Sequence, residues 1–238
     1  ERQKNGHSAL EGINFTLPVG RSVGLVGRVG SGKSTLAQLV PRMFDVSTGA
    51  ILVDGQDTRK LALRELRRLI GYVPQEPFLF STSLKANLAL GRESYSAEEL
   101  ARAVEIAKLD RDVEIFPLGL ETLVGERGVT LSGGQKQRAT LARALIMDPP
   151  VLILDDCLSS VDAQTEAEIL HGLRAILKEK TCLIISHRIS AVREADEILV
   201  LDEGKIIERG NHDELVRDGG VYAELYQQQR LSEELEQI

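Results

Sequence analysis

One twelve-residue stretch, GLVGRVGSGKST at Gly24–Thr35, constrains the fold of this chain more than any other part. It joins the apolar run Ser22–Val26, which has the length of a buried strand, to a helical pattern over Lys33–Met43. The glycines let the loop curl so that backbone N–H groups point inward at an anion. The helix N-terminus adds partial positive charge at the same point. The order of strand, glycine loop and helix predicts an α/β domain that binds phosphate.

This loop fits the pattern G-x-x-x-x-G-K-[ST]. We expect Lys33 to reach the β- and γ-phosphates of a nucleotide, and the Ser34 hydroxyl to ligate Mg²⁺. A glycine-rich turn that binds nothing is the alternative, and the strand before the loop and the helix after it argue against that alternative. The residues expected to contact the nucleotide are Gly27, Arg28, Val29, Gly30, Ser31, Gly32, Lys33, Ser34 and Thr35.

A second motif, VLILDD, places two carboxylates after an apolar strand. We expect this strand to neighbour the strand of the phosphate loop, so that Asp155 becomes the second Mg²⁺ partner. It would act through water, because Mg²⁺ keeps much of its hydration. A turn-capping role for Asp155 is the alternative, but the run Val151–Leu154 is too apolar for an ordinary turn.

The chain alternates strand-like and helical segments, which predicts a largely parallel sheet with its ligand at the carboxyl ends of strands. One stretch, from about 78 to 147, is helical throughout and interrupts the alternation. We therefore expect one domain over 1–238, with an α/β core at 1–77 and 148–238 and an inserted helical subdomain. The expected strands are Gly12–Leu17, Ser22–Val26, Ala50–Val53, Ile70–Pro74, Val151–Asp155, Thr181–Ser186, Glu197–Leu201 and Lys205–Glu208.

Composition narrows the possible partners. The net charge of −7 argues against nucleic-acid binding, which requires a basic face. Apolar residues make up 42% of the chain, enough for a full core, but their runs are strand-length, well short of the ~20 residues that span a bilayer. Cys157 and Cys182 lie in or beside apolar runs and have no metal-ligand spacing, so we interpret them as reduced core residues of a cytosolic protein.

The stretch LSGGQKQRATLARAL, at Leu131–Leu145, forms a second candidate anion site. Its serine is a helix N-cap, and the two glycines permit close approach of a ligand to the helix N-terminus. One chain thus carries two half-sites for phosphate. The residues expected to contact nucleotide here are Ser132, Gly133, Gly134 and Gln135.

With these motifs the chain resembles the nucleotide-binding domain of ABC transporters over essentially its whole length. In that family two domains pack head to tail, and each ATP lies between the phosphate loop of one and the signature of the other. The resemblance implies that the two half-sites serve different ATP molecules, with Mg²⁺. It also implies a P-loop NTPase fold, with a RecA-like parallel sheet, an antiparallel β part and a helical insertion. The matching segments are Gly27–Thr35 (Walker A), Gln75 (Q-loop), Leu131–Gln135 (signature), Leu152–Asp155 (Walker B), Ser159–Asp162 (D-loop) and His187 (switch histidine).

Two further segments resemble exporters whose transmembrane helices are fused to this domain. They are PQEPFLFSTSLKANLALG after Gln75 and the GERG of Gly125–Gly128. The resemblance implies that this domain lies at the cytoplasmic face of a membrane and contacts a transmembrane domain through the coupling helices of that domain. Glu126 would belong to the loop that senses those helices. A surface ion pair is the plain alternative for Glu126. A free-standing ABC protein acting on ribosomes or nucleic acid is the alternative for the chain.

One position departs from the family. The family has glutamate where this chain has Asp156, and that glutamate polarises the attacking water. Because the aspartate is one methylene shorter, we expect tight ATP binding, slow hydrolysis and a heterodimer whose other subunit carries the glutamate. A slow homodimer and a regulatory ATP-binding module are the alternatives. The expected catalytic residues are Asp156, His187 and Gln75, and the expected metal ligands are Ser34, Gln75 and Asp155.

The family's adenine-stacking aromatic has no match upstream of the phosphate loop. Phe15 is the only aromatic residue there, and it lies too close to Gly27. The opening ERQKNGHSAL resembles the linker that follows that aromatic. We therefore expect this chain to be a fragment that lacks the first strand and the transmembrane domain.

Overall fold

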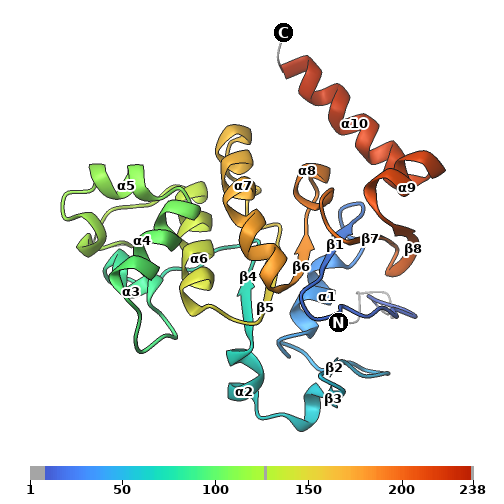
Figure 1. Ribbon diagram of the computed structural model, residues 1–238, viewed down its shortest axis with the longest axis horizontal. Helices are drawn as coiled ribbons and strands as arrows, with labels where there is room; N and C mark the ends of the chain where they lie inside the picture. The colour runs from blue at the N-terminus through green and yellow to red at the C-terminus, as the bar shows by residue number, and fades with distance from the viewer. Residues whose placement is uncertain (1–8, 126–127, 237–238) are drawn as a thin grey trace.

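A six-stranded sheet with helices on both faces forms the centre of the computed structural model, which describes residues 9–125 and 128–236 (Figure 1). The strand order is β4-β5-β6-β1-β7-β8. All neighbours pair parallel except β7 and β8, which pair antiparallel. This mixed sheet confirms the predicted P-loop fold class. The strands of the sheet are β1 Ser22–Val26, β4 Ile70–Val73, β5 Val151–Asp155, β6 Thr181–Ile185, β7 Glu197–Asp202 and β8 Lys205–Gly210.

Alternate residues of the strands pack into two separate hydrophobic cores, one on each face of the sheet. Ile153 and Leu183 face α1 and α2, whereas Leu152 and Ile184 face α6, α7 and α8. Because successive side chains of a strand point to opposite faces, a sheet covered on both faces needs continuous apolar strands. This explains why the strands read as apolar runs in the sequence. The helices of the α/β core are α1 Lys33–Leu39, α2 Leu63–Arg68, α7 Ala163–Glu179 and α8 Ile189–Val192.

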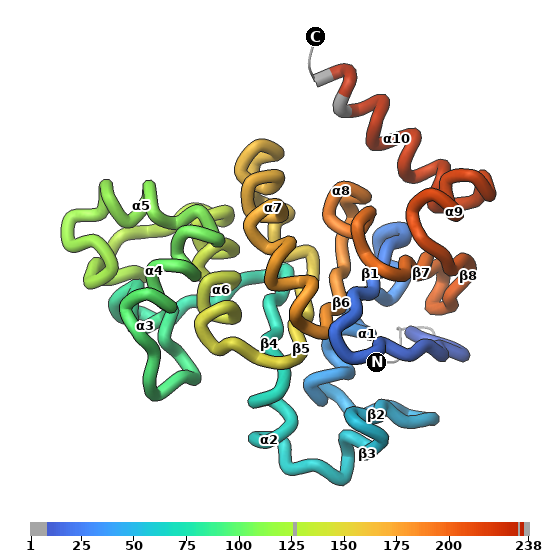
Figure 2. Tube along the Cα trace, viewed as in Figure 1, coloured from blue at the N-terminus to red at the C-terminus, as the bar shows by residue number. Residues whose placement is uncertain are grey.

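The helical segment gathers beside the β4 edge of the sheet (Figure 2). It contains four α-helices and the 3₁₀ turn η2 Gly119–Glu121; between 78–125 and 128–147 the sheet receives no strand. Capping boxes begin α4 and α6, in each of which a serine and the residue three positions later bond each other's backbone. The four helices are α3 Leu84–Leu88, α4 Ala97–Ile106, α5 Asp110–Ile115 and α6 Gly133–Met147.

Two predicted strands are wrong or shortened. The segment Gly12–Leu17 joins no ladder, although Ile13, Phe15 and Leu17 are half-buried against the core and the residues between them are exposed. The predicted strand from Ala50 is reduced to β2 Leu52–Val53, which pairs with β3 Gln56–Asp57 ahead of the 3₁₀ turn η1 Thr58–Lys60. The alternation predicted which side chains turn inward. It could not predict a ladder, because a ladder requires a partner strand.

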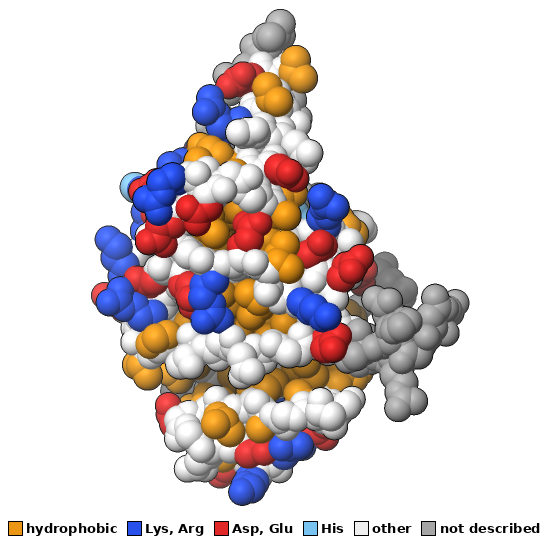
Figure 3. Space-filling view, turned by 90° about the vertical axis from the view of Figure 1, so that its right-hand side faces the viewer, with side chains coloured by type: hydrophobic (Ala, Val, Ile, Leu, Met, Phe, Trp, Pro, Cys, Tyr) orange, Lys and Arg blue, Asp and Glu red, His pale blue; other side chains and the backbone are white. Residues whose placement is uncertain are grey.

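Two helices follow β8 at the C-terminal end. They are α9, His212–Asp218, and α10, Val221–Glu236. Helix α10 rises from the body of the molecule at the top of Figure 3, above a face where basic and acidic side chains are interspersed. Among the described residues, no helix combines the length and apolarity needed to cross a bilayer.

Helix α7 packs against the sheet through a buried face that includes Ile169 and Leu173. Leu173 on α7 is fully buried, whereas Leu231 on α10 is 60% exposed. We predict that Leu173→Ala lowers the free energy of unfolding by about 2–5 kcal/mol, since it leaves a cavity. The matched change Leu231→Ala should alter it by less than about 0.5 kcal/mol. Urea denaturation monitored by circular dichroism measures both, and equal effects would contradict this assignment of the core.

Candidate nucleotide site

The parallel register brings three strand ends into one row. Leu25 of β1 and Asp155 of β5 both pair with Ile185 of β6. The residues that follow therefore emerge at the same edge of the sheet: the glycine loop after β1, His187 after β6 and Asp156 after β5. Since β6 lies between β1 and β5, Asp155 is on the next strand but one. The expectation of a directly neighbouring strand was wrong, because β6, the strand that precedes His187, occupies that place.

The glycine loop has the backbone geometry of an anion cradle. Gly27 has φ +148°, and a Cβ atom there would lie 2.0 Å from the carbonyl oxygen of Leu201. Only glycine fits so close to another backbone. Gly32 precedes α1 with φ +102°, and at Gly30, which is exposed, an added Cβ would meet nothing within 4 Å. The loop thus turns tightly at its base and stays open at its tip.

The Lys33 ammonium group lies inside this loop. The side chain is 5% exposed, and its Nζ donates to the carbonyl oxygens of Gly27 at 2.8 Å and Arg28 at 2.9 Å. Burial lowers the pKa of Lys33, and the charges of Asp156 and Asp155 oppose that shift. Lys33 Nζ also donates to Ser31 Oγ at 3.4 Å. A buried cation whose partners are all neutral oxygens of its own loop is suited to receive phosphate oxygens.

Asp155 receives a hydrogen bond on each carboxylate oxygen. Ser34 Oγ donates to Oδ1 and the Tyr72 hydroxyl donates to Oδ2, both at 3.0 Å. Burial raises the pKa of Asp155, which is 1% exposed, while these two hydrogen bonds act in the opposite direction. Tyr72 was missed at the sequence level. Its position in β4, three residues before Gln75, is the signal that could have found it.

The oxygens of Ser34 and Asp155 fit a magnesium site. Hydroxyl and carboxylate oxygens are hard ligands, and Mg²⁺ keeps several waters and substrate phosphates in its shell, so few protein ligands are needed. In the described part of the chain, no three His, Cys, Asp or Glu residues form a cluster able to hold a metal. A cavity of about 530 Å³, lined in part by Ser34, Gln75 and Asp155, extends from this point towards α6.

The three residues predicted as catalytic meet at the carboxylate of Asp156. Gln75 Nε2 lies 3.3 Å from Oδ2, and His187 Nε2 lies 3.4 Å from the same oxygen. The backbone N–H of His187 faces Oδ1 at 3.3 Å. Asp156 itself is 7% exposed and has φ +49°. These contacts are long for hydrogen bonds, so the carboxylate is surrounded but loosely held.

The signature segment begins α6 with a capping box. Ser132 Oγ accepts from the N–H of Gln135 at 3.2 Å, and Gln135 Oε1 accepts from the N–H of Ser132 at 2.8 Å. Gln135 also donates to Asp112 at 2.7 Å, which ties the helix start to α5. Ser132 and Gly133 are exposed. The start of α6 therefore remains open to a ligand or a partner.

Gln137 joins three motifs and was missed at the sequence level. It is 2% exposed; its Nε2 donates to Ser159 Oγ at 2.9 Å and to the carbonyl oxygen of Gln75 at 3.2 Å. Its Oε1 accepts from the N–H of Ser160 at 2.8 Å. A polar residue on the buried face of a helix was the available signal. One amide thus connects α6 to the segments that hold Gln75 and Ser159.

The predicted D-loop residue Asp162 has a local contact in the structure. Asp162 Oδ1 accepts from the N–H of Thr165 at 2.9 Å, which makes it the N-cap of α7 and lowers its pKa. This local role leaves its expected role at a dimer interface as a prediction. Glu126 lies outside the described residues.

Comparison with known proteins shows the family to which this chain belongs. The model of the ABC transporter family matches residues 10–159. An ATP-dependent lipid A-core flippase of Pectobacterium atrosepticum is 46% identical over 93% of this chain and 38% of its own length. A probable multidrug resistance ABC transporter ATP-binding/permease protein, YheI of Bacillus subtilis, has the same identity and coverage.

The structural comparison agrees. A bacterial Atm1-family ABC exporter solved with ATP bound superposes with a TM-score of 0.91 and 40% identity, over 97% of this chain and 40% of the exporter chain. The chain therefore spans about two fifths of the length of these relatives. The chain belongs to the ABC transporter family, and it is an ATP-binding ATPase domain of that family.

Proposed function

We propose that this domain hydrolyses ATP to power an exporter, at the cytoplasmic face of a membrane. The observation that carries the proposal is that one chain has two helix N-termini suited to bind phosphate. One is the Lys33 loop before α1, and the other is the open, capped N-terminus of α6. Two such half-sites are complete only if two domains pair head to tail. Relatives named as a flippase and an exporter support the export role. The core of 1–77 and 148–238, with its helical insertion, would act as one domain.

The first step is the capture of ATP by the glycine loop. Lys33 would exchange its carbonyl partners for phosphate oxygens, and the N–H groups of the loop and of α1 would complete the cradle. Ser34, Asp155 and Gln75 would hold Mg²⁺. The bound ion would neutralise charge on the phosphates.

Hydrolysis would depend on Asp156 and His187. Asp156 would orient the attacking water and accept its proton, while His187 would donate to an oxygen of the γ-phosphate. Gln75 and His187 already approach the carboxylate of Asp156. With one methylene less than glutamate, that carboxylate reaches less far towards a water, and a displacement of about 1 Å can cost on the order of a hundredfold in rate. The site would therefore bind ATP and hydrolyse it slowly.

The partner would be a second, non-identical nucleotide-binding domain with glutamate at the matching position. This chain would lend its intact signature, Ser132 to Gln135, to the competent site of the partner. A regulatory clamp that binds ATP with almost no turnover is the second candidate, and the loosely held Asp156 favours it over a fast homodimer. A full-length transporter built only from subunits with this domain, if it turned over ATP rapidly, would contradict the heterodimer.

We predict that Asp156→Glu raises steady-state ATP hydrolysis by at least about tenfold, because the longer carboxylate can reach the water. The rate should rise more than linearly with protein concentration, since two chains form each site. Phosphate release at increasing protein concentration measures both effects. Lys33→Ala in the same background is the control and should abolish turnover. An unchanged rate in Asp156→Glu, with MgATP still bound, would show that Asp156 is not the brake.

We predict that Asp155→Asn stabilises the domain while it abolishes Mg²⁺-dependent hydrolysis. Because the pKa of Asp155 is raised in the folded state, ionising it in the native protein is unfavourable. Removing that charge should therefore raise the melting temperature at pH 7. The gain should shrink as the pH falls below the folded pKa, where the wild-type group is protonated. Asp218→Asn, whose parent side chain is 64% exposed, is the matched control. A lower melting temperature for Asp155→Asn would contradict the prediction.

A further inference from the structure

A side chain far along the sequence holds the segment that carries His187. Gln229 of α10 lies against the backbone between β6 and α8. Its Oε1 accepts from the N–H of Ile189 at 2.8 Å, and its Nε2 donates to the carbonyl oxygen of His187. We propose that Gln229 is a positioning residue for ATP hydrolysis, acting through His187. This inference rests on the function proposed above.

The His187 segment is held from two sides. On one side the N–H of His187 faces Asp156 Oδ1 at 3.3 Å. On the other side Gln229 binds the carbonyl oxygen of the same residue. The ring of His187 is 38% exposed and reaches Asp156 Oδ2 at 3.4 Å. Since a half-exposed ring has little packing to orient it, its place depends on the backbone of its segment. Gln229 holds that backbone at His187, while Glu166 pairs with the side chain of the next residue, Arg188.

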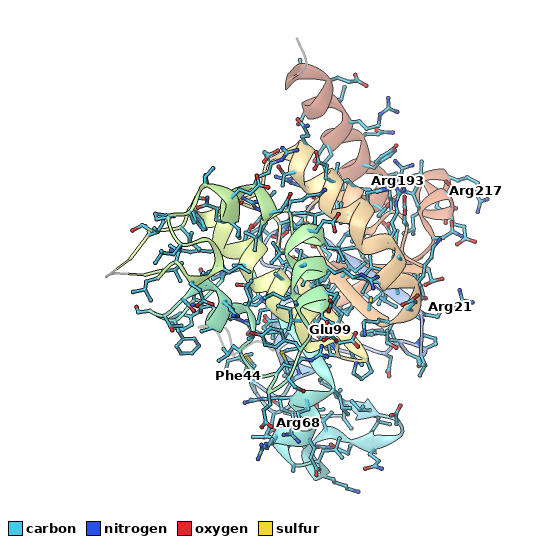
Figure 4. The ribbon with its side chains drawn as sticks, turned by 60° about the vertical axis from the view of Figure 1, so that its left-hand side comes forward. Arg21, Phe44, Arg68, Glu99, Arg193 and Arg217 are labelled. Carbon is cyan, nitrogen blue, oxygen red and sulfur yellow. The ribbon has the colours of Figure 1, made fainter. Side chains whose placement is uncertain are left out.

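Gln229 can act as a fixed point because α10 is anchored at its start. Both carboxylate oxygens of Glu208 accept backbone N–H groups, from Val221 and Tyr222. Tyr222 is fully buried, and its hydroxyl lies 2.8 Å from His212 Nδ1. Arg193, directly after α8, lies beside the base of α10 (Figure 4). The anchor therefore belongs to the body of the domain.

Helix α10 connects this anchor to Gln229, which contacts the His187 segment. Tyr222 and Gln229 are seven residues apart, with the partly buried Leu225 and Tyr226 between them. Residues spaced by three and four lie on one face of a helix, so the four side chains form a single stripe against the domain. Seven residues span about 10 Å, so Gln229 stands two turns above the anchor. The anchored N-terminus of α10 thus fixes where Gln229 contacts the backbone at His187.

A purely structural role for Gln229 predicts a different result. If Gln229 only stabilised α8 or α10, its loss would lower the melting temperature and would act independently of His187. If it positions His187, its loss should lower kcat with little change in KM for ATP, because the phosphate loop remains intact. The effect should also disappear once His187 is removed, since coupled residues are non-additive.

The test compares Gln229→Ala with Gln227→Ala in the full chain. Gln227 is an exposed glutamine of the same helix, so the control makes the same change away from the contact. We expect Gln229→Ala to lower kcat about five- to tenfold, the scale of one or two hydrogen bonds, and Gln227→Ala to leave it unchanged. Gln229→Glu keeps an acceptor for Ile189 but loses the donor to His187, and it should also lower kcat.

A double-mutant cycle decides whether the effect runs through His187. In the His187→Ala background, adding Gln229→Ala should lower kcat no further. An equal fall in both backgrounds, or a kcat for Gln229→Ala equal to that of Gln227→Ala, would overturn the proposal.

A chain with no turnover in any variant would refute the proposed ATPase role instead. The NMR signal of the His187 ring, identified by its loss in His187→Ala, would then decide. A displacement in Gln229→Ala and not in Gln227→Ala supports the positioning role, and an unmoved signal overturns it.

Discussion

Parallel pairing of β5, β6 and β1 is the constraint on which the site depends. Leu25, Ile185 and Asp155 stand in one row across these strands, so the segments that follow them emerge together. Lys33, His187 and Asp156 come from distant parts of the sequence, yet the register delivers them to one edge. Parallel strands need both faces covered, and the two cores built from alternate strand residues provide that cover.

Amide side chains connect the elements around this edge. Gln75 reaches Asp156, Gln137 binds the segments of Gln75 and Ser159, and Gln229 binds the backbone at His187. A primary amide both donates and accepts, so it can hold two backbone or side-chain groups without bringing a charge into the site. The carboxylates and Lys33 provide the charged groups of the site, and the three amides hold the segments around them in place.

The two adjacent aspartates have different surroundings. Asp155 is bound on both oxygens by Ser34 and Tyr72 at 3.0 Å, as a fixed ligand should be. Asp156 has left-handed backbone geometry and long contacts to Gln75 and His187. Short contacts suit a group that stays in place, and long contacts suit one that must turn towards a water. The difference in geometry follows the difference in proposed roles.

The sequence alone determined the fold class, the glycine loop and the signature, because each depends on local rules. A glycine loop between strand and helix, an N-cap serine and apolar strand runs are readable without any partner. The tertiary structure decided what depends on pairing. In the folded chain, Gly12–Leu17 joins no ladder and β6 lies between β1 and β5. Folding also brings three amino acids to the site that the sequence did not indicate: Tyr72, Gln137 and Gln229. A hydrogen bond between distant residues leaves no periodic signal in the sequence, so only the folded chain reveals it.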